Sequence, residues 1–406
     1  MPQRLRSEWP IIVLVTIFVV LGLVYSTVVP LWEAPDEPAH FKYIVHIRER
    51  HSIPVQQVGA LDAAHHPPLY YVIAALVSSP VSFDLTGAFQ PNPEFTWAKH
   101  ESMAHNVGLH RTAETFPYRG TVLAMHMIRL ISVAASAATV AFTYAIVRRL
   151  LPGSPWLALL ASAIVAFNPQ FLFIGSSVSP ESLGAMTSAL ALWQLIRAIE
   201  EPLRWQRWAL TGVCCGVAML SKSSTIVVSI VSGLLLFLSA IRHRSWRLLW
   251  KGALALSLAF LLVSGWYFAR NWILYNDPLA FQIFLENWDT VRRYDTVEWP
   301  DVYKFFTTQF ESYWAFFGWM TLGVPKWIYQ ALETMCQVSL VGWAIWLWRR
   351  GWRLLGKNGS LGLIAVVLAA LLQEILLFRA IFTFDGSWYQ GRYLFPAIAP
   401  WVYCWR

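Results

Sequence analysis

The adjacent acids Asp36 and Glu37 are the feature of this sequence that most resembles a reaction centre. Pro38 suits the first turn of a helix, and His40 would then lie near the acids on one face of that helix. A carboxylate in this setting can act as a general base toward a hydroxyl, or can hold a divalent metal together with the imidazole. Helix capping by the acids and a surface position for His40 explain the same spacing without chemistry.

A pair of histidines follows about thirty residues later. His65 and His66 precede two prolines, which restrict the backbone, so that one imidazole could reach the acids and complete a site. A solvated pair at a membrane surface is the alternative. A divalent metal bound by Asp36, Glu37, His40 or His66 therefore stays open, and the residues require no other cofactor.

Cations near apolar segments supply the third group of candidates. Lys222 stands between two apolar blocks and is flanked by serines, where a charge is costly unless it has a function or reaches the interface. Arg270 and Arg392 are candidates for contact with a phosphate, because a guanidinium can bind one through two hydrogen bonds. Tyr393 follows Arg392, and Asp385 is a further candidate acid just before them.

The composition requires these groups to be positioned by membrane helices. Of the 406 residues 57% are hydrophobic and 13% are charged, whereas soluble domains carry about 25% charged residues. The apolar residues form continuous blocks of about 20, the length of a membrane helix, rather than the short alternating segments of a barrel. The net charge of +8 lies mostly in short connections between the blocks, so we expect no nucleic-acid partner.

The sequence therefore predicts an all-α, polytopic bundle that forms a single transmembrane domain over residues 1–406. About ten spans are expected, at residues 10–30, 122–147, 156–178, 181–199, 208–221, 223–241, 250–268, 328–348, 360–380 and 392–406. The fifth is short and could pair with the sixth as a broken hairpin around Lys222. The tenth stops where the sequence stops, which leaves open a span that is cut short.

The placement of lysine and arginine predicts the orientation. With a cytoplasmic N-terminus, five segments on the inner side hold fifteen basic and three acidic residues, in agreement with the positive-inside rule. Two long connections, about 31–121 and 269–327, then lie outside. Both are rich in aromatic residues, so we expect them to be partly helical and folded on the outer face. The apolar stretch that ends near residue 81 is expected to be re-entrant or to lie on the surface.

These motifs together resemble the GT-C class of integral membrane glycosyltransferases, near the dolichyl-phosphate-mannose protein mannosyltransferases and the aminoarabinose transferases. The most specific matches are Pro35-Asp36-Glu37 with His40, and His66-Pro67-Pro68-Leu69 at the end of the first outer loop. Further matches, some of them closer to a bacterial subgroup of that superfamily, are Leu220-Ser221-Lys222-Ser223, Asn168-Pro169-Gln170, Arg270-Asn271, Phe317-Gly318-Trp319 and Gly391-Arg392-Tyr393-Leu394-Phe395-Pro396. The chain departs from the pattern in its short C-terminal part.

The resemblance implies an inverting transfer of a sugar from a polyprenyl-phosphate donor to an extracytoplasmic glycan, lipid or protein. Asp36 is then the first choice for the acid that deprotonates or orients the acceptor, and Glu37 is the second. Lys222, Arg270 and Arg392 are expected to stabilise the departing phosphate. His40, His65, His66 and Tyr393 complete the expected substrate-binding set.

Two other functions stay open. A transporter or flippase of a lipid-linked saccharide would have internal repeats and charged or broken helices at mid-membrane. The sequence has no clear repeat, and its polar residues gather at the outer ends of the spans. A non-catalytic membrane scaffold would bind a polyprenyl phosphate without turnover.

Overall fold

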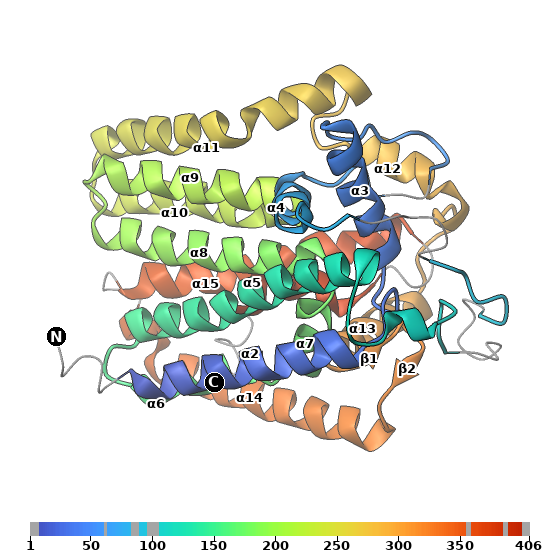
Figure 1. Ribbon diagram of the computed structural model, residues 1–406. Helices are drawn as coiled ribbons and strands as arrows, with labels where there is room; N and C mark the ends of the chain where they lie inside the picture. The colour runs from blue at the N-terminus through green and yellow to red at the C-terminus, as the bar shows by residue number, and fades with distance from the viewer. Residues whose placement is uncertain are drawn as a thin grey trace.

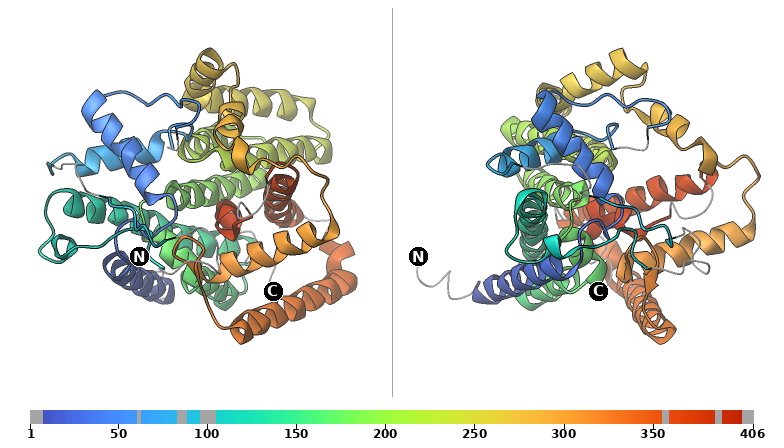
Figure 2. Two further views of the ribbon diagram at one scale, coloured as in Figure 1. Left: turned by 90° about the vertical axis from the view of Figure 1, so that its right-hand side faces the viewer. Right: turned by 45° about the vertical axis from the view of Figure 1, so that its right-hand side comes forward.

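The computed structural model describes residues 8–60, 63–82, 89–95, 105–354, 359–384 and 389–399. The long helices run side by side as a bundle, and the shorter helices gather at one end (Figures 1 and 2). The long helices are α2 (Trp9–Val28), α5 (Gly120–Leu150), α6 (Pro155–Ala166), α8 (Pro180–Glu200), α9 (Trp205–Ser221), α10 (Ile226–Arg242), α11 (Trp246–Tyr275), α14 (Lys326–Leu354) and α15 (Gly359–Phe378).

Within the described ranges, six helices are long and apolar enough to cross a membrane. They are α2, α5, α8, the segment Ser223–Arg242, α11 and the segment Leu361–Phe382. A seventh span results if α6 and the short helix α7 (Pro169–Gly175), bent by 63° relative to each other, count as one. The chain is thus an all-α, multi-pass membrane protein, and the predicted count of about ten spans is not confirmed.

The difference in span number has local causes. Helices α9 and α14 occupy two predicted spans but are not among the six. Residues Gly391–Ala397 form a short 3₁₀ helix where the tenth span was predicted, and residues 400–406 lie outside the described ranges. The predicted span 156–178 is broken because the side chain of Asn168 caps α7, accepting a hydrogen bond of 2.8 Å from the amide of Phe171.

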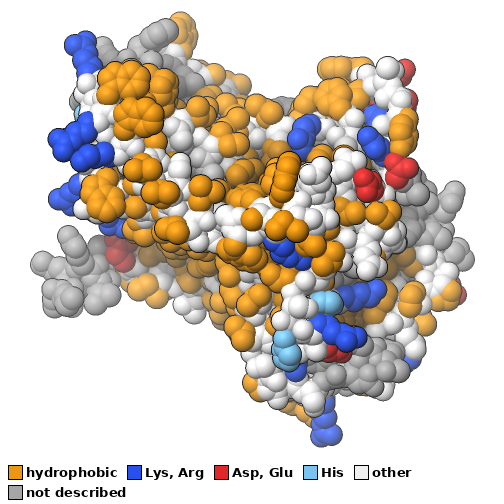
Figure 3. Space-filling view, turned by 90° about the horizontal axis from the view of Figure 1, so that it is seen from above, with side chains coloured by type: hydrophobic (Ala, Val, Ile, Leu, Met, Phe, Trp, Pro, Cys, Tyr) orange, Lys and Arg blue, Asp and Glu red, His pale blue; other side chains and the backbone are white. Residues whose placement is uncertain are grey.

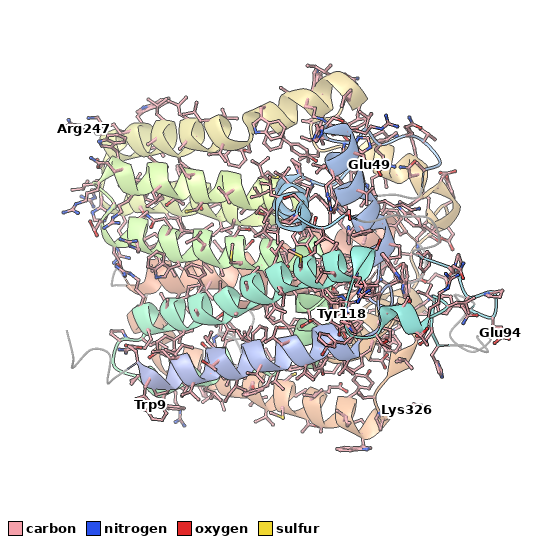
Figure 4. The ribbon with its side chains drawn as sticks, viewed as in Figure 1. Trp9, Glu49, Glu94, Tyr118, Arg247 and Lys326 are labelled. Atoms are coloured by element: carbon pink, nitrogen blue, oxygen red, sulfur yellow. The ribbon has the colours of Figure 1, made fainter. Side chains whose placement is uncertain are left out.

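The two ends of the bundle carry different sets of charged side chains. Trp9 and Arg247 lie at one end, whereas Glu49, Tyr118 and Lys326 lie at the other (Figure 4). Seen from above, hydrophobic side chains cover the middle of the molecule. Lys and Arg side chains line the edge of the end that carries Arg247, whereas the other end shows Lys and Arg mixed with Asp, Glu and His side chains (Figure 3). Both long connections lie at the opposite end (Figure 1). Their extracytoplasmic location stays a prediction.

The two long connections contain helices that fold onto the end of the bundle. The first contains α3 (Glu37–Arg50) and α4 (Leu69–Ser78), joined by stacking of Tyr43 on Tyr71 with ring centroids 3.9 Å apart. Ten residues of helix extend about 15 Å, half of the apolar thickness of a bilayer, so α4 is too short to span it. The second contains α12 (Phe281–Asn287), α13 (Trp299–Trp314) and a hairpin of β1 (Phe316–Phe317) and β2 (Leu322–Gly323), antiparallel with Phe316 opposite Gly323.

A buried ion pair fixes the first connection to the bundle. The guanidinium of Arg129 in α5 donates to both carboxylate oxygens of Glu37, at 2.9 and 2.8 Å, and neither side chain has any exposed surface. Glu37 also accepts hydrogen bonds of 2.8 Å from the amides of Trp32 and Val178. The carboxylate therefore has four donors, which a buried negative charge needs to be tolerated.

Arg129 also caps the C-terminal end of α2. Arg129 donates to the carbonyl oxygens of Ser26 and Val29 at 2.9 and 2.7 Å, and to that of Pro30 at 3.0 Å. The last carbonyl groups of a helix have no partner within that helix, and Arg129 supplies one at the end of α2. The chain before α3, α3 itself, α5 and the segment before α8 thus meet at one charge pair.

We expect Glu37→Gln to destabilise the protein strongly, because the substitution leaves the Arg129 charge buried without a counter-ion. Loss of one partner of a buried pair costs about 3–5 kcal/mol. Thermal unfolding of the purified protein in detergent measures this change, with Glu49→Gln on the exposed part of α3 as the control. A Glu37→Gln protein as stable as the control would show that the pair does not hold the fold.

Candidate functional site

A cavity of about 450 Å³ lies where the two long connections meet the bundle. Its walls come from α3, the segment before α4, α12, the hairpin turn, the start of α8, the α9–α10 turn and the end of α15. Among its lining residues are six of the ten candidates named from the sequence, namely Asp36, His40, His65, His66, Lys222 and Tyr393. The acidic, imidazole and cationic groups therefore converge, although they are far apart in the sequence.

Asp36 directs its carboxylate toward this cavity. It precedes α3 in a left-handed backbone conformation, with φ of +66°, which aspartate and asparagine adopt more readily than most residues. Its side chain is 44% exposed, whereas that of the next residue, Glu37, is completely buried. The two adjacent carboxylates thus have different surroundings, and only Asp36 is accessible to a substrate.

Arg392 forms an ion pair with the Asp36 carboxylate. Its Nη2 lies 2.5 Å from Asp36 Oδ2 and 3.3 Å from the hydroxyl of Tyr393, and its side chain is only 3% exposed. Gly391 makes this approach feasible, because a Cβ there would lie 2.3 Å from the carbonyl oxygen of Gln309 in α13. Arg392 itself is not part of the cavity wall.

The charges around Asp36 keep it ionised. Burial raises the pKa of the Asp36 carboxyl, but Arg392, His40 and Lys222 together hold this pKa below its ordinary value. The group is therefore a carboxylate throughout the neutral range, and its orientation is fixed by the short ion pair.

The three histidines of the cavity are neutral, because burial lowers the pKa of each imidazole. Burial lowers the pKa of His40 to about 3, although the Asp36 charge raises it, and burial lowers the pKa of His65 to about 4. Burial also lowers the pKa of His66 well below its ordinary value. His40 is hydrogen-bonded through Nδ1 to the hydroxyl of Tyr71 at 2.9 Å, and His65 through Nδ1 to Gln56 at 3.2 Å. These contacts leave neutral, oriented imidazoles in the wall.

The side chain of Lys222 is buried and forms an ion pair with Glu181, near the start of α8. Its Nζ also lies 5.0 Å from the centre of the Tyr393 ring. Glu181 is a residue of the site that the sequence analysis missed. It stands in the predicted span 181–199 just after Ser179-Pro180, and an acid at the outer end of a span is the signal that could have identified it.

Arg379 is a second residue that was missed. It follows α15, its side chain is exposed, and its guanidinium lies 4.7 Å from the centre of the Phe281 ring. Arg379 lines the cavity, and no carboxylate among the described residues forms an ion pair with it. Its position at the end of the apolar segment Leu361–Phe382 could have identified it from the sequence.

Two candidates lie away from the cavity. Glu37 is enclosed by Arg129, and Arg270 donates to the carbonyl oxygens of Ile53 and Pro54, at 3.3 and 2.6 Å. Both residues therefore hold the first connection in place, and neither lines the wall. Asp385 lies outside the described residues.

Aromatic side chains form another wall of the cavity. Phe281, Phe284 and Trp288 come from α12 and the residue after it, and Trp319 from the hairpin turn. The indole of Trp319 donates to the carbonyl oxygen of Trp32 at 3.0 Å, which joins the two connections across the site. Flat aromatic faces beside charged groups suit a ligand with both apolar and polar parts.

The described residues contain no group of three His, Cys, Asp or Glu side chains arranged to hold a metal ion. The acids of the cavity are instead each paired with a basic side chain, Asp36 with Arg392 and Glu181 with Lys222.

Comparison with known proteins finds a family model that matches part of the chain and solved structures with a similar fold. Residues 122–268, from α5 to α11, match the family model described as dolichyl-phosphate-mannose-protein mannosyltransferase. ArnT from Cupriavidus metallidurans, solved with undecaprenyl phosphate bound, superimposes with a TM-score of 0.54 and 13% identity over 98% of this chain and 60% of ArnT. This chain has the fold of the GT-C membrane glycosyltransferases. The fold that the resemblance in the sequence implied is thereby confirmed.

Two further solved structures match parts or most of this chain and are larger than it. The archaeal oligosaccharyltransferase AglB from Archaeoglobus fulgidus, in complex with an inhibitory peptide and a dolichol-phosphate, has a TM-score of 0.52 and 10% identity over 98% of this chain and 50% of AglB. The S. cerevisiae protein O-mannosyltransferase Pmt1-Pmt2 complex has a TM-score of 0.40 and 20% identity, over 67% of this chain and 34% of that one. The chain spans 60% of ArnT and half of AglB, and no curated protein matches its sequence.

Proposed function

We propose that this protein is a glycosyltransferase that moves a sugar from a polyprenyl-phosphate donor to an extracytoplasmic acceptor, with inversion at the sugar. The observation that carries the proposal is the convergence on one cavity of an ionised, oriented Asp36 and of Arg379, which has no carboxylate partner among the described residues. The GT-C fold supports it, because ArnT and AglB with this fold were solved with undecaprenyl phosphate and dolichol-phosphate.

The donor phosphate is proposed to bind at Arg379. A phosphodiester carries one negative charge, and Arg379 at the end of an apolar helix lies where a lipid phosphate meets the interface. Lys222 is the second cation of the wall, although Glu181 already neutralises it. The apolar side chains of Leu376, Leu377 and Ala380 beside Arg379 offer a surface for the first part of the prenyl chain.

Asp36 is proposed to act on the acceptor. As the acceptor oxygen bonds to the anomeric carbon of the sugar, the bond from that carbon to the phosphate oxygen breaks. The acceptor proton passes to Asp36, and the polyprenyl phosphate leaves with the electron pair and an additional negative charge. A single displacement of this kind inverts the anomeric carbon. Cations already in position stabilise the charge that develops on the phosphate.

Arg392 and the histidines have supporting roles in this scheme. Arg392 orients the Asp36 carboxylate and keeps it ionised before the acceptor arrives. His40, His65 and His66 are neutral, so they offer hydrogen bonds to hydroxyl groups without adding positive charge. Glu37 and Arg270 are assigned to the fold rather than to the reaction.

Asp36→Asn is expected to lower the transfer rate by about 10²–10⁴-fold, the usual contribution of a general base. The fold should survive, because asparagine also adopts the left-handed conformation and keeps the size of the side chain. Transfer from a radiolabelled polyprenyl-phosphate sugar measures the rate, and thermal unfolding checks the fold. A folded Asp36→Asn protein with wild-type transfer would exclude Asp36 as the base, and a wild type that binds the lipid without turnover would favour a scaffold.

The pH dependence of transfer should reveal the Asp36–Arg392 pair. A base works only when deprotonated, so activity is present above its pKa and is lost as the pH falls through it. Because the pKa of Asp36 is below its ordinary value, the wild type should show no loss from this group between about pH 5 and 8. In Arg392→Gln burial is no longer opposed by the adjacent cation, so the acidic fall should move to higher pH. Tyr393→Phe, which keeps Arg392, is the control, and an unchanged profile in Arg392→Gln would contradict this assignment.

Arg379→Gln is expected to weaken binding of undecaprenyl phosphate by about ten-fold or more, since a charge-assisted hydrogen bond contributes about 1.5–3 kcal/mol. Quenching of tryptophan fluorescence in detergent measures the affinity. Arg247→Gln, an exposed arginine at the opposite end of the bundle, is the matched control. Equal affinities of the two variants would remove Arg379 from the phosphate site.

A further inference from the structure

Glu181 has a carboxylate oxygen that its surroundings leave unsatisfied. Its Oε1 is paired with Nζ of Lys222, whereas Oε2 is buried and has no hydrogen-bond partner in the part of the chain that the structure describes. The side chain is 6% exposed and belongs to the cavity wall. Buried carboxylate oxygens normally accept hydrogen bonds, because their hydration is lost on folding. An oxygen of this kind at a cavity wall is suited to a donor on a ligand.

The two acids of the cavity differ in accessibility and therefore in role. The Asp36 side chain is 44% exposed, so its carboxylate can receive a proton from an acceptor that enters the cavity. Glu181 is held at one oxygen by Lys222, and Lys222 is itself packed against the Tyr393 ring and Gly184. A carboxylate fixed in this way is adapted to hold a ligand in one orientation, which is a positioning role.

We infer that Glu181 accepts a hydrogen bond through Oε2 from a hydroxyl group of the transferred sugar, and that this sugar is uncharged. The inference rests on the proposed function, since it assigns the sugar of the polyprenyl-phosphate donor to the part of the cavity beside Glu181, Lys222 and Tyr393.

The charges of the site argue for a hydroxyl donor rather than an ammonium. Among the described residues, Asp36 is balanced by Arg392 and Glu181 by Lys222, and only Arg379 remains without a counter-charge. One phosphodiester balances Arg379, so the donor needs no second charge. An amino sugar at Glu181 would bring its cation next to the ammonium of Lys222, which repels it, whereas a hydroxyl group satisfies Oε2 without that repulsion.

The test compares two lipids on the same protein. Affinities for undecaprenyl phosphate and for an undecaprenyl-phosphate hexose are measured by fluorescence quenching, and their ratio gives the contribution of the sugar. In Glu181→Gln we expect this ratio to fall about ten-fold, while the affinity for undecaprenyl phosphate itself does not fall, because Lys222 keeps its positive charge beside the cavity and loses its counter-ion. Glu181→Asp, which keeps the charge for Lys222 but withdraws the carboxylate from the cavity, should lower the ratio as well.

Matched variants and kinetics separate this role from a loss of structure. Glu374→Gln changes another carboxyl group of the bundle that does not line the cavity, and it should leave the ratio unchanged. Transfer assays with Glu181→Gln should show a raised KM for the hexose donor with a smaller change in kcat, and an unaltered pH profile. A lost base would instead lower kcat.

The binding measurements distinguish failure of the proposed function from failure of the Glu181 assignment. If the wild type does not bind undecaprenyl phosphate, the proposed function fails. If it binds but both Glu181 variants keep the full contribution of the hexose, the Glu181 assignment is overturned while the function stands. If an undecaprenyl-phosphate amino sugar binds the wild type more tightly than the hexose, the uncharged class of sugar is overturned.

Discussion

The Glu37–Arg129 ion pair is the constraint on which the candidate site depends. It joins the end of α2, the start of α3, α5 and the chain before α8, all by contacts of 2.7–3.0 Å. Once Glu37 is fixed in this way, the preceding residue can only turn outward, and the left-handed backbone at Asp36 allows it. Glu37 thus stabilises the fold, whereas its neighbour Asp36 faces the cavity.

Adjacent acids are ambiguous in a sequence for this reason. The pattern Asp36-Glu37 with His40 predicted a reactive group at this point, but it could not rank the two carboxylates by role. Their difference arises from Arg129, which lies 92 residues away and carries no local motif. Arg270 illustrates the same limit, because a cation just outside a span fits a phosphate contact and a tie to loop carbonyls equally well.

The bundle itself was predictable because it depends on composition and block length. The apolar blocks, the basic turns and the two long connections at one end follow from hydrophobicity and charge, which act locally. The break between α6 and α7 was missed because it depends on Asn168, whose amide also donates to the carbonyl oxygen of Tyr313 in α13, 145 residues away. Glu181 and Arg379 were missed because they sit at helix ends within apolar blocks, where the hydrophobic signal dominates.

In the sugar transfer that we propose, with Asp36 as the base, Arg392 imposes a compromise on the chemistry. A cation 2.5 Å from Asp36 keeps the carboxylate ionised and fixed, yet it lowers the affinity of that carboxylate for a proton. A weak base is useful only if the acceptor hydroxyl becomes acidic as its bond to the sugar forms, which happens when the departure of the phosphate leads. The cations that stabilise the leaving phosphate and the arginine that weakens the base therefore belong together. Such a site favours a transition state in which the sugar is already separated from its phosphate before the acceptor loses its proton.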